Sequence, residues 1–384
     1  MTSGTVNIEP ALTALAAALR GEGPAVELSA GPDGSPIIEL VDTPGFADAA
    51  AVVRTSGSTG TPKATVLTLE ALAASSVATA FALKGEGQWL LALPVQYVAG
   101  LQVLVRSLFA GTRPWVMDLS GGFTPAAFTT AALELTDRIR FTSLVPTQLQ
   151  RLLDAPSAET LAVLRRFNAI LLGGAPASPG LLAAARAAGV HVVTTYGSAE
   201  TCGGCVYDGF PLEDVLVRVE GDGRILLGGA TIAAGYLGTP ELTAEAFVED
   251  DGVRWYRTDD LGELDGDGKL TVLGRADDVV ITGGVKVSAA HVQTELEKLD
   301  GVLAAFVAGV PSAEWGHALA AYVAVADSSP AGIEDVTASA LRAPLLGRLA
   351  PKTVLVAGEL LMLPNGKPDR LGMIVRLHGL HQGK

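Results

Sequence analysis

Apolar residues along the first half of the chain fall into short runs that alternate with longer segments of helical periodicity. Strands are expected over residues 51–55, 89–94, 140–145, 168–172 and 191–195. Helices are expected over 69–83, 101–110 and 146–153, with a further helix ending at 188. Strands that alternate with helices in this way predict largely parallel sheets covered by helices.

The pattern changes after Gly209, where short alternating runs are separated by Asp-Gly turns. Strands expected over 215–219 and 224–227 flank Gly221-Asp222-Gly223, and strands over 261–264 and 270–273 flank residues 265–268. Asp-Gly between alternating runs is a hairpin signal. This region is therefore expected to be antiparallel.

A smaller α+β pattern begins near Val279. Ser288 is expected to cap a helix in which Val292, Leu296 and Leu299 share one face. Strands over 303–310, 318–325 and 353–356 and a helix over 333–341 complete the expected elements.

We place a domain boundary near Asp277, which gives a large domain over residues 1–276 and a small mobile domain over 277–384. The fold class is α/β. The large N-terminal domain combines helix-covered, mostly parallel sheets with an antiparallel β subdomain, and the C-terminal domain is a small α+β unit. A chain of 384 residues is long enough for such a division.

Composition and charge exclude several classes of protein. Hydrophobic residues make up 49% of the chain and charged residues 18%, which is typical of a folded protein with a large core. The net charge is 27 − 41 = −14. An acidic surface repels nucleic acid and anionic lipid. A bound polyanion would therefore need local backbone donors, a few basic side chains and a metal ion.

The two cysteines, Cys202 and Cys205, form a single Cys-x-x-Cys pair. Zinc would require further ligands at suitable spacing, and a disulfide framework is not expected from two cysteines. We find no signal-peptide pattern at the N-terminus and no apolar run long enough to span a membrane. The sequence therefore predicts a cytoplasmic protein that neither inserts into a membrane nor binds nucleic acid; a homodimer is left open.

A glycine-rich stretch gives the strongest chemical signal. It reads Thr55-Ser56-Gly57-Ser58-Thr59-Gly60-Thr61-Pro62-Lys63. Its two glycines let the backbone approach a ligand closely, while five hydroxyls, free amides and Lys63 can contact phosphate oxygens. The stretch does not have the Walker spacing. We interpret it as a phosphate-binding loop.

The loop closely resembles the phosphate-binding signature of the adenylate-forming enzymes, which include acyl-CoA synthetases, luciferases and peptide-synthetase adenylation domains. Further family motifs follow in the family's order. Gly173-Gly174-Ala175-Pro176 resembles the wall on which adenine stacks. Thr195 and Tyr196-Gly197-Ser198-Ala199-Glu200-Thr201 resemble the next motif, which implies that Tyr196 packs against adenine and Glu200 holds Mg²⁺. Ala199 replaces the usual hydroxyl residue, so Ser198 or Thr201 is expected to compensate.

Two further motifs resemble those that hold the ribose and join the domains. Tyr256-Arg257-Thr258-Asp259-Asp260 implies that the Asp260 carboxylate accepts hydrogen bonds from both ribose hydroxyls. Asp259 stands where the family has glycine, which predicts only a local change. Gly274-Arg275-Ala276-Asp277-Asp278 implies that Arg275 reaches ribose or phosphate and that Asp277 is the pivot between domains.

The C-terminal motifs imply roles in both halves of the reaction. Gly283 and Gly284 lie in a segment that resembles the family's pantetheine channel for CoA. Lys367 lies in Leu363-Pro364-Asn365-Gly366-Lys367-Pro368-Asp369-Arg370, which resembles the loop that carries the catalytic lysine. A mobile ammonium would offset the negative charge that develops at the α-phosphate of ATP.

Two segments carry a further resemblance: Leu93-Pro94-Val95-Gln96-Tyr97-Val98-Ala99-Gly100-Leu101, followed by Arg106, and Ser143-Leu144-Val145-Pro146-Thr147-Gln148-Leu149. Together they resemble the o-succinylbenzoate–CoA ligases of menaquinone biosynthesis. Tyr97 stands where many relatives have histidine, and Gly203 would form part of the substrate-pocket wall. Arg106 has two interpretations: a surface arginine, or an anchor for a second carboxylate on the substrate. A dicarboxylate substrate favours the second.

The resemblance thus implies ATP-dependent activation of a carboxylic acid and its transfer to CoA, with Mg²⁺ as cofactor. Two alternatives remain. One is a medium-chain or aryl acyl-CoA ligase, and the other is a nucleotide-binding module without catalysis. Retention of Glu200, Asp260, Arg275 and Lys367 argues against the second alternative.

Overall fold

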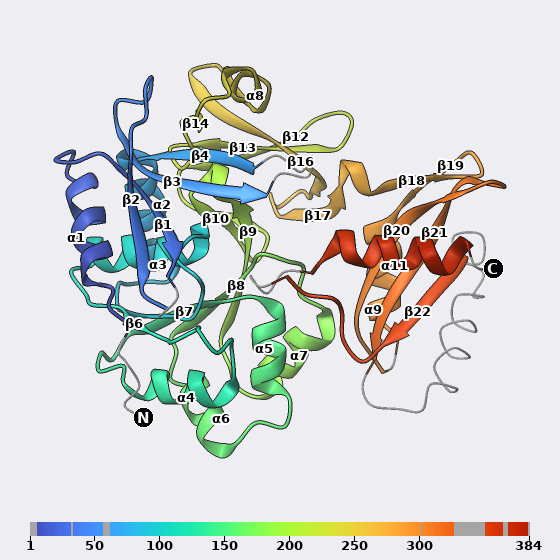
Figure 1. The fold of residues 1–384 in the computed structure, drawn as a ribbon, viewed down its shortest axis with the longest axis horizontal. Helices are drawn as coiled ribbons and strands as arrows, with labels where there is room; N and C mark the ends of the chain where they lie inside the picture. Colours follow the sequence, from blue (N-terminus) through green and yellow to red (C-terminus); the bar gives the residue numbers. More distant parts are fainter. Residues whose placement is uncertain are drawn as a thin grey trace.

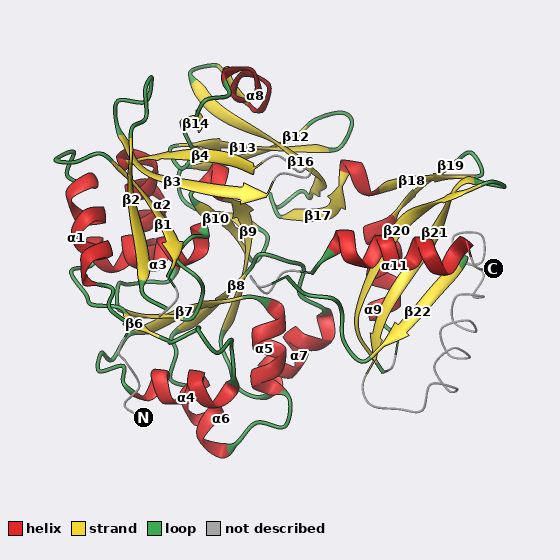
Figure 2. Cartoon of the chain, in the orientation of Figure 1, coloured by secondary structure: helices red, strands yellow, loops and turns green. Residues whose placement is uncertain are grey.

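The described residues of the chain fold into four sheets with covering helices in the computed structural model (Figure 1). The structure describes residues 6–31, 34–56, 62–299, 301–325, 350–363 and 368–382. Three sheets lie within residues 25–275, and the fourth lies within residues 279–357. Figure 2 shows the helices gathered around the sheets of the first part and on both sides of the last sheet.

A seven-stranded sheet forms the centre of the first part, in the order β11-β10-β9-β8-β7-β5-β6. Its strands are β5 (Gln88–Leu91), β6 (Trp115–Val116), β7 (Arg140–Leu144), β8 (Ala169–Leu172), β9 (Val192–Ser198), β10 (Gly203–Tyr207) and β11 (Phe210–Pro211). The five strands from β9 to β6 are parallel, whereas β10 pairs antiparallel with both β9 and β11. The sequence-based expectation of helix-covered parallel strands is confirmed for this sheet.

Helices cover both faces of this sheet because its strand residues alternate between two apolar cores. Trp89, Leu91 and Phe141 belong to one core cluster, and Leu90 and Ile170 belong to the other. The first core contains buried residues of α1 (Glu9–Ala18), α2 (Leu69–Ala82) and α3 (Val98–Phe109). The second contains residues of α4 (Pro125–Leu133), α5 (Pro146–Leu153), α6 (Ala158–Leu164) and α7 (Pro179–Ala187).

A five-stranded sheet carries the strands on either side of the glycine-rich loop. Its order is β14-β4-β3-β1-β2, with β1 (Ala25–Ala30), β2 (Pro36–Val41), β3 (Ala49–Ser56), β4 (Pro62–Thr68) and β14 (Gly235–Tyr236). Only β1 and β3 are parallel. The sequence predicted that a helix follows the loop, but the hairpin partner β4 lies between the loop and α2.

The third sheet is antiparallel throughout, as the Asp-Gly turns predicted. It contains β12 (Val215–Val219), β13 (Arg224–Gly229), β15 (Phe247–Asp250), β16 (Val253–Leu264) and β17 (Leu270–Arg275), and α8 (Pro240–Ala246) precedes β15. The strand expected over 261–264 is the end of the longer β16. Two short helical turns, η1 (Ala199–Thr201) and η2 (Ala276–Asp278), lie next to the candidate site.

The last sheet has its own two cores. Its strands are β18 (Val279–Thr282), β19 (Val285–Ser288), β20 (Val302–Ser312), β21 (Gly316–Val325) and β22 (Thr353–Ala357), with α9 (Ala289–Glu297) and α11 (Arg370–Gln382) as described helices. Val292 and Leu296 of α9 pack in one core, and Met373 and Leu377 of α11 pack in the other. The Ser288 side chain caps α9 as predicted.

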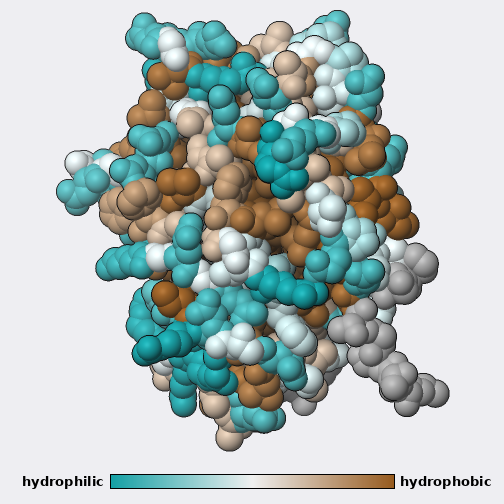
Figure 3. Space-filling view, turned by 90° about the vertical axis from the view of Figure 1, so that its left-hand side faces the viewer, coloured by the Kyte–Doolittle hydropathy of each residue, from teal (hydrophilic) through white to brown (hydrophobic). Residues whose placement is uncertain are grey.

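The division of the chain at residues 276 and 277 stays a prediction, and the helix expected over 333–341 lies outside the described residues. Among the described helices, none is long and apolar enough to cross a lipid bilayer. Figure 3 shows polar residues over much of one face of the molecule, with apolar residues between them.

Candidate active site

The glycine-rich loop lies at the tip of the hairpin formed by β3 and β4. Thr55 pairs with Lys63 and Ser56 pairs with Pro62, so the last described residues on each side are held in register. Residues 57–61, which include Gly57, Ser58, Thr59 and Gly60, lie outside the described residues. The Lys63 ammonium lies 5.1 Å from the centre of the Tyr236 ring. The two paired strands therefore hold Thr55 and Lys63 side by side, and Lys63 places one cation next to Tyr236.

Glu200 lies in η1, directly after β9, and is 6% exposed. Its Oε1 accepts a hydrogen bond of 2.9 Å from the Tyr236 hydroxyl, and its backbone oxygen accepts one of 2.9 Å from the Ala233 amide. The pKa of Tyr236 is raised, first by burial and then by the charge of Glu200. The phenol therefore stays protonated and donates to the Glu200 carboxylate.

The donor set fits a magnesium ion that arrives with a nucleotide. No described residue donates a hydrogen bond to the second oxygen of Glu200, so this oxygen has capacity for a cation. Within the described part of the chain, no group of three or more His, Cys, Asp or Glu side chains forms a cage for a metal. Mg²⁺ is commonly held by one or two carboxylates together with substrate phosphates. A single carboxylate beside a phosphate loop matches that arrangement.

The predicted adenine and ribose residues meet across two sheets. The Tyr196 hydroxyl donates a hydrogen bond of 2.7 Å to Oδ2 of Asp260, which lies 64 residues further along the chain. The backbone amide of Asp260 donates to the Thr258 hydroxyl at 3.0 Å. Burial, and then Asp260, raise the pKa of Tyr196. Tyr196 therefore holds the carboxylate that the sequence assigned to the ribose.

Asp259, which replaces the glycine expected by resemblance, forms ion pairs with two arginines. Its carboxylate lies 3.3 Å from Nη2 of Arg275 and 3.6 Å from Nη1 of Arg224. Arg275 pairs with Asp260 across β16 and β17 in the strand register. All three charged side chains are a quarter to a half exposed, so these pairs contribute little to stability. They do fix Arg275 beside Asp260.

The adenine-wall motif lies where β8 ends, beside Thr195. A Cβ atom added at Gly173 would lie 2.3 Å from Oγ1 of Thr195, so only glycine fits there. The Thr195 hydroxyl donates to the Leu172 oxygen at 3.3 Å. Gly174 has φ +81° and is exposed, as is Pro176, whereas Ala175 is half-buried. Their contact with adenine stays a prediction.

The Tyr196–Ser198 segment is itself part of β9, whereas the sequence predicted that the strand ends at Thr195. Gly197 and Ser198 pair with Gly204 and Gly203 of β10. This pairing turns the chain sharply at η1, which carries Glu200.

Gly197→Ala is expected to destabilise the protein by about 1–3 kcal/mol, because a Cβ atom there would lie 2.1 Å from the Gly203 backbone oxygen. Chemical denaturation monitored by circular dichroism measures the free energy of unfolding. Gly180→Ala in α7 is the matched control, since a Cβ atom there would meet nothing within 4 Å. Equal stability of the two variants would contradict this account.

The missing hydroxyl at Ala199 is not replaced by Thr201. The Thr201 hydroxyl accepts from the Ser198 amide at 2.9 Å and lies 2.7 Å from the Gly203 oxygen, to which it donates. Its one proton is therefore used within the turn. The Ser198 hydroxyl is buried and has no hydrogen-bond partner among the described residues. Of the two residues expected to compensate, Ser198 is the one with a hydroxyl to offer.

Arg106 is only 6% exposed, so the interpretation as a surface arginine is wrong. Its guanidinium lies 5.1 Å from the Trp89 ring centre, and its Nε has no hydrogen-bond partner among the described residues. Burial lowers the pKa of Arg106, and the Tyr207 hydroxyl partly offsets this effect. No described carboxylate forms an ion pair with Arg106. A buried guanidinium with no carboxylate beside it among the described residues is unusual.

The other predicted acid-binding residues lie around the same helix. Tyr97 is the N-cap residue of α3. Gly203 has φ +97°, and a Cβ atom there would lie 3.5 Å from Cγ of Gln102. Gln102 and Arg106 are four residues apart and so share a face of α3. The structure therefore brings Gly203 and Arg106 to the same side of α3.

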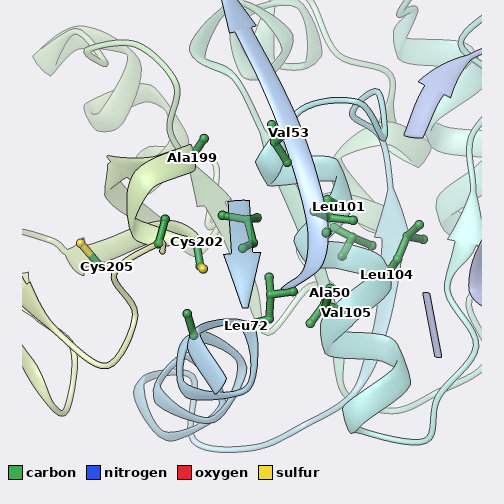
Figure 4. Packing of buried hydrophobic residues seen from close by; sticks show 14 of the residues in the cluster. Ala50, Val53, Leu72, Leu101, Leu104, Val105, Ala199, Cys202 and Cys205 are labelled. Atoms are coloured by element: carbon green, nitrogen blue, oxygen red, sulfur yellow. The ribbon is translucent and has the colours of Figure 1, made fainter. Parts of the chain in front are cut away.

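Cys202 and Cys205 are free, buried thiols that belong to the same apolar core cluster as Leu72 and Leu101 (Figure 4). Burial raises the pKa of both thiols, that of Cys205 to about 12. The thiolate is the form that binds metals and reacts. The geometry therefore favours a structural role for the pair.

The C-terminal motifs are described only in part. Gly283 and Gly284 form the β18–β19 turn with φ +55° and +80°, and the Gly283 amide donates to the Trp315 oxygen at 3.1 Å. Asp277 lies in η2, between β17 and β18. Lys367 lies outside the described residues. Met362 and Pro368, on either side of that segment, form an isolated antiparallel bridge.

Tyr236 is the contact that sequence reasoning missed. It follows Gly235 in a short strand and has no charged neighbour in sequence to attract notice. Its partners are distant in sequence: Glu200 precedes it by 36 residues (236 − 200) and Lys63 by 173 residues (236 − 63).

Comparisons with known proteins identify the family of the chain. Residues 22–237 match the family model described as AMP-binding enzyme. The chain belongs to the AMP-binding enzyme family. This confirms the resemblance to the adenylate-forming enzymes.

Among curated relatives, a protein of Mycobacterium tuberculosis H37Rv named probable 2-succinylbenzoate–CoA ligase is 43% identical. The match covers 86% of this chain and 85% of that protein. A 2-succinylbenzoate–CoA ligase of Listeria monocytogenes serotype 4b is 30% identical over 86% of this chain and 71% of its own length.

Solved structures support the predicted α/β fold class. The o-succinylbenzoate CoA synthetase MenE from Bacillus subtilis, solved in complex with the acyl-adenylate intermediate OSB-AMP, matches with a TM-score of 0.71 at 26% identity. That match covers 88% of this chain and 70% of that one. ATP-bound MatB from Rhodopseudomonas palustris matches with a TM-score of 0.74 at 27% identity, over 91% and 74%.

Proposed function

We propose that this protein activates o-succinylbenzoate with ATP and transfers the acyl group to CoA, releasing AMP and pyrophosphate. The observation that supports this substrate is Arg106, a buried guanidinium that pairs with no carboxylate of the described residues. A dicarboxylic acid has one carboxylate to activate and a second for such a cation to bind. The 43% identity to a protein named probable 2-succinylbenzoate–CoA ligase supports the same substrate.

In the first half-reaction, one oxygen of the substrate carboxylate attacks the α-phosphorus of ATP. The bond from that phosphorus to the bridging oxygen of pyrophosphate breaks, and acyl-adenylate forms. Asp260, held by Tyr196, would bind the ribose hydroxyls, and Glu200 would hold the magnesium ion. Mg²⁺ bound with ATP would offset charge on the phosphate oxygens. Lys63 and Lys367 would add positive charge at the two ends of the triphosphate.

In the second half-reaction, the thiol sulfur of CoA attacks the acyl carbon, AMP leaves and the thiol proton passes to solvent. We propose that residues 277–384 rotate about Asp277 between the two steps. This rotation would withdraw Lys367 and bring the Gly283–Gly284 turn to the site. Two buried free thiols suit the reducing cytoplasm, where we place the reaction.

Acid-dependent release of pyrophosphate from ATP tests the proposal. A panel of o-succinylbenzoate, benzoate and a medium-chain fatty acid should show the highest kcat/KM for o-succinylbenzoate, and CoA should be needed only for thioester formation. Preference for benzoate or the fatty acid would favour the alternative ligases. Absence of turnover with every acid would favour a module that binds nucleotide without catalysis.

A further inference from the structure

The short strand β14 joins the carboxylate assigned to the metal and the strand that follows the phosphate loop. Gly235 and Tyr236 pair with Val66 and Thr65 of β4. The amides of Ala234 and Leu237, which flank this strand, donate to backbone oxygens of β4 at 3.0 and 2.8 Å. The segment is therefore fixed to the phosphate-loop hairpin by backbone hydrogen bonds on both sides.

The same segment holds Glu200 in two ways. The Ala233 amide donates to the Glu200 backbone oxygen, and the Tyr236 hydroxyl donates to the Glu200 carboxylate, both at 2.9 Å. One hydrogen bond fixes the position of the residue, and the other fixes the rotation of its side chain. The second carboxylate oxygen is left for a cation.

Tyr236 is itself held rigidly. It is 1% exposed, its amide donates to the Thr243 hydroxyl at 2.9 Å, and its ring packs edge-on against Phe247 with centroids 5.3 Å apart. Two further side chains contact it: the Tyr256 hydroxyl forms a hydrogen bond with its hydroxyl, and the Lys63 ammonium lies 5.1 Å from its ring centre. The rigid Tyr236 side chain thus contacts Glu200 of η1 and Lys63 of β4. These are the two elements that a magnesium–ATP complex would contact.

We propose that Tyr236 is a positioning residue, which orients the Glu200 carboxylate toward a divalent cation bound with the ATP phosphates. It contacts neither the reacting atoms nor the cation. The Tyr236 hydroxyl donates a hydrogen bond to Oε1 of Glu200 and so holds Oε2 in a single orientation. This inference rests on the proposed ATP-dependent function and adds a coupling between the phosphate hairpin and the metal site.

Tyr236→Phe keeps the ring and its contact with Lys63 but removes the hydroxyl. We expect the dissociation constant of Mn²⁺ in the complex with α,β-methylene-ATP to rise about 10-fold, as for other partners that orient a metal ligand. Electron paramagnetic resonance of free Mn²⁺ measures this constant without turnover and without acid. Binding of the analogue in EDTA should stay within about 2-fold of the wild type, because the hydroxyl acts through the metal.

Two controls separate positioning from a structural role. Tyr207→Phe removes another buried phenol hydroxyl, which lies 3.1 Å from the Thr79 hydroxyl, and should leave Mn²⁺ affinity unchanged in the absence of acid. Glu200→Gln should lower Mn²⁺ affinity by itself, and adding Tyr236→Phe should then have no further effect. Thermal melting of each variant monitors the fold.

Unchanged Mn²⁺ affinity in Tyr236→Phe would overturn this inference. It would also be overturned if Tyr236→Phe weakened Mn²⁺ binding equally in the wild-type protein and in Glu200→Gln. Either result leaves the proposed function standing, provided that Glu200→Gln alone weakens Mn²⁺ binding. Failure of the wild-type protein to bind α,β-methylene-ATP with Mn²⁺ would instead overturn the proposed function.

Discussion

Replacement of Lys367 by alanine is expected to lower the rate of acyl-adenylate formation about 10²–10³-fold, the usual effect of losing one preorganised group that stabilises transition-state charge. The variant should still convert supplied o-succinylbenzoyl-adenylate and CoA to the thioester at close to the wild-type rate. Lys367 lies outside the described residues, so its role rests on the Asn365-Gly366-Lys367 motif. Pyrophosphate release measures the first half-reaction, and thioester absorbance measures the second.

Lys298→Ala is the matched control for loss of one lysine from the same region. The Lys298 side chain is 55% exposed, pairs with Glu295 of α9 and belongs to none of the motifs discussed. It should leave both half-reactions unchanged. Equal loss of both half-reactions in Lys367→Ala would contradict the role assigned to Lys367. A lysine that acts only on the α-phosphate is not needed once the adenylate has formed.

The sequence predicts elements best where local signals agree. Pro146 at the first helical turn, the Gln148 side chain bonded to the Val145 amide and an apolar face together specify α5, whose bounds of 146–153 match the prediction. β4 was missed because Pro62 and Lys63 begin it and because its pairing with β3 spans a glycine-rich loop. Strand pairing depends on the partner strand, and no local pattern records it.

The candidate site likewise has residues that the sequence predicts and contacts that it does not predict. Chain-local motifs point to Tyr196, Glu200 and Asp260, and the structure places the first two in contact with partners from other sheets. The Asp259 pairs and the Tyr236 contact depend on which strands lie side by side, so spacing along the chain could not show them. The burial of Arg106 likewise depends on Trp89, which lies on a neighbouring strand.

Replacement of Arg106 by leucine is expected to lower kcat/KM for o-succinylbenzoate about 100-fold. Removing one partner of a buried, hydrogen-bonded ion pair costs about 2–5 kcal/mol, and each 1.4 kcal/mol is a factor of ten. The effect should fall on the KM for the acid, while the KM for ATP stays unchanged. A substrate with a single carboxylate should lose nothing, because it has no second anion for Arg106 to bind. Acid-dependent pyrophosphate release across both kinds of acid makes the measurement.

The stability of Arg106→Leu distinguishes a role of Arg106 in ligand binding from a role in packing. No carboxylate of the described residues offsets the burial of the Arg106 charge, so leucine at this position should leave the free energy of unfolding unchanged or raise it. Arg140→Gln provides the matched comparison, since Arg140 is also buried but its Nε donates to the Asp137 oxygen. That variant should lose stability and keep its affinity for the acid. The opposite result would be an Arg106→Leu protein that unfolds more easily and still binds o-succinylbenzoate normally. That result would show that Arg106 stabilises the core and does not bind the second carboxylate of the substrate.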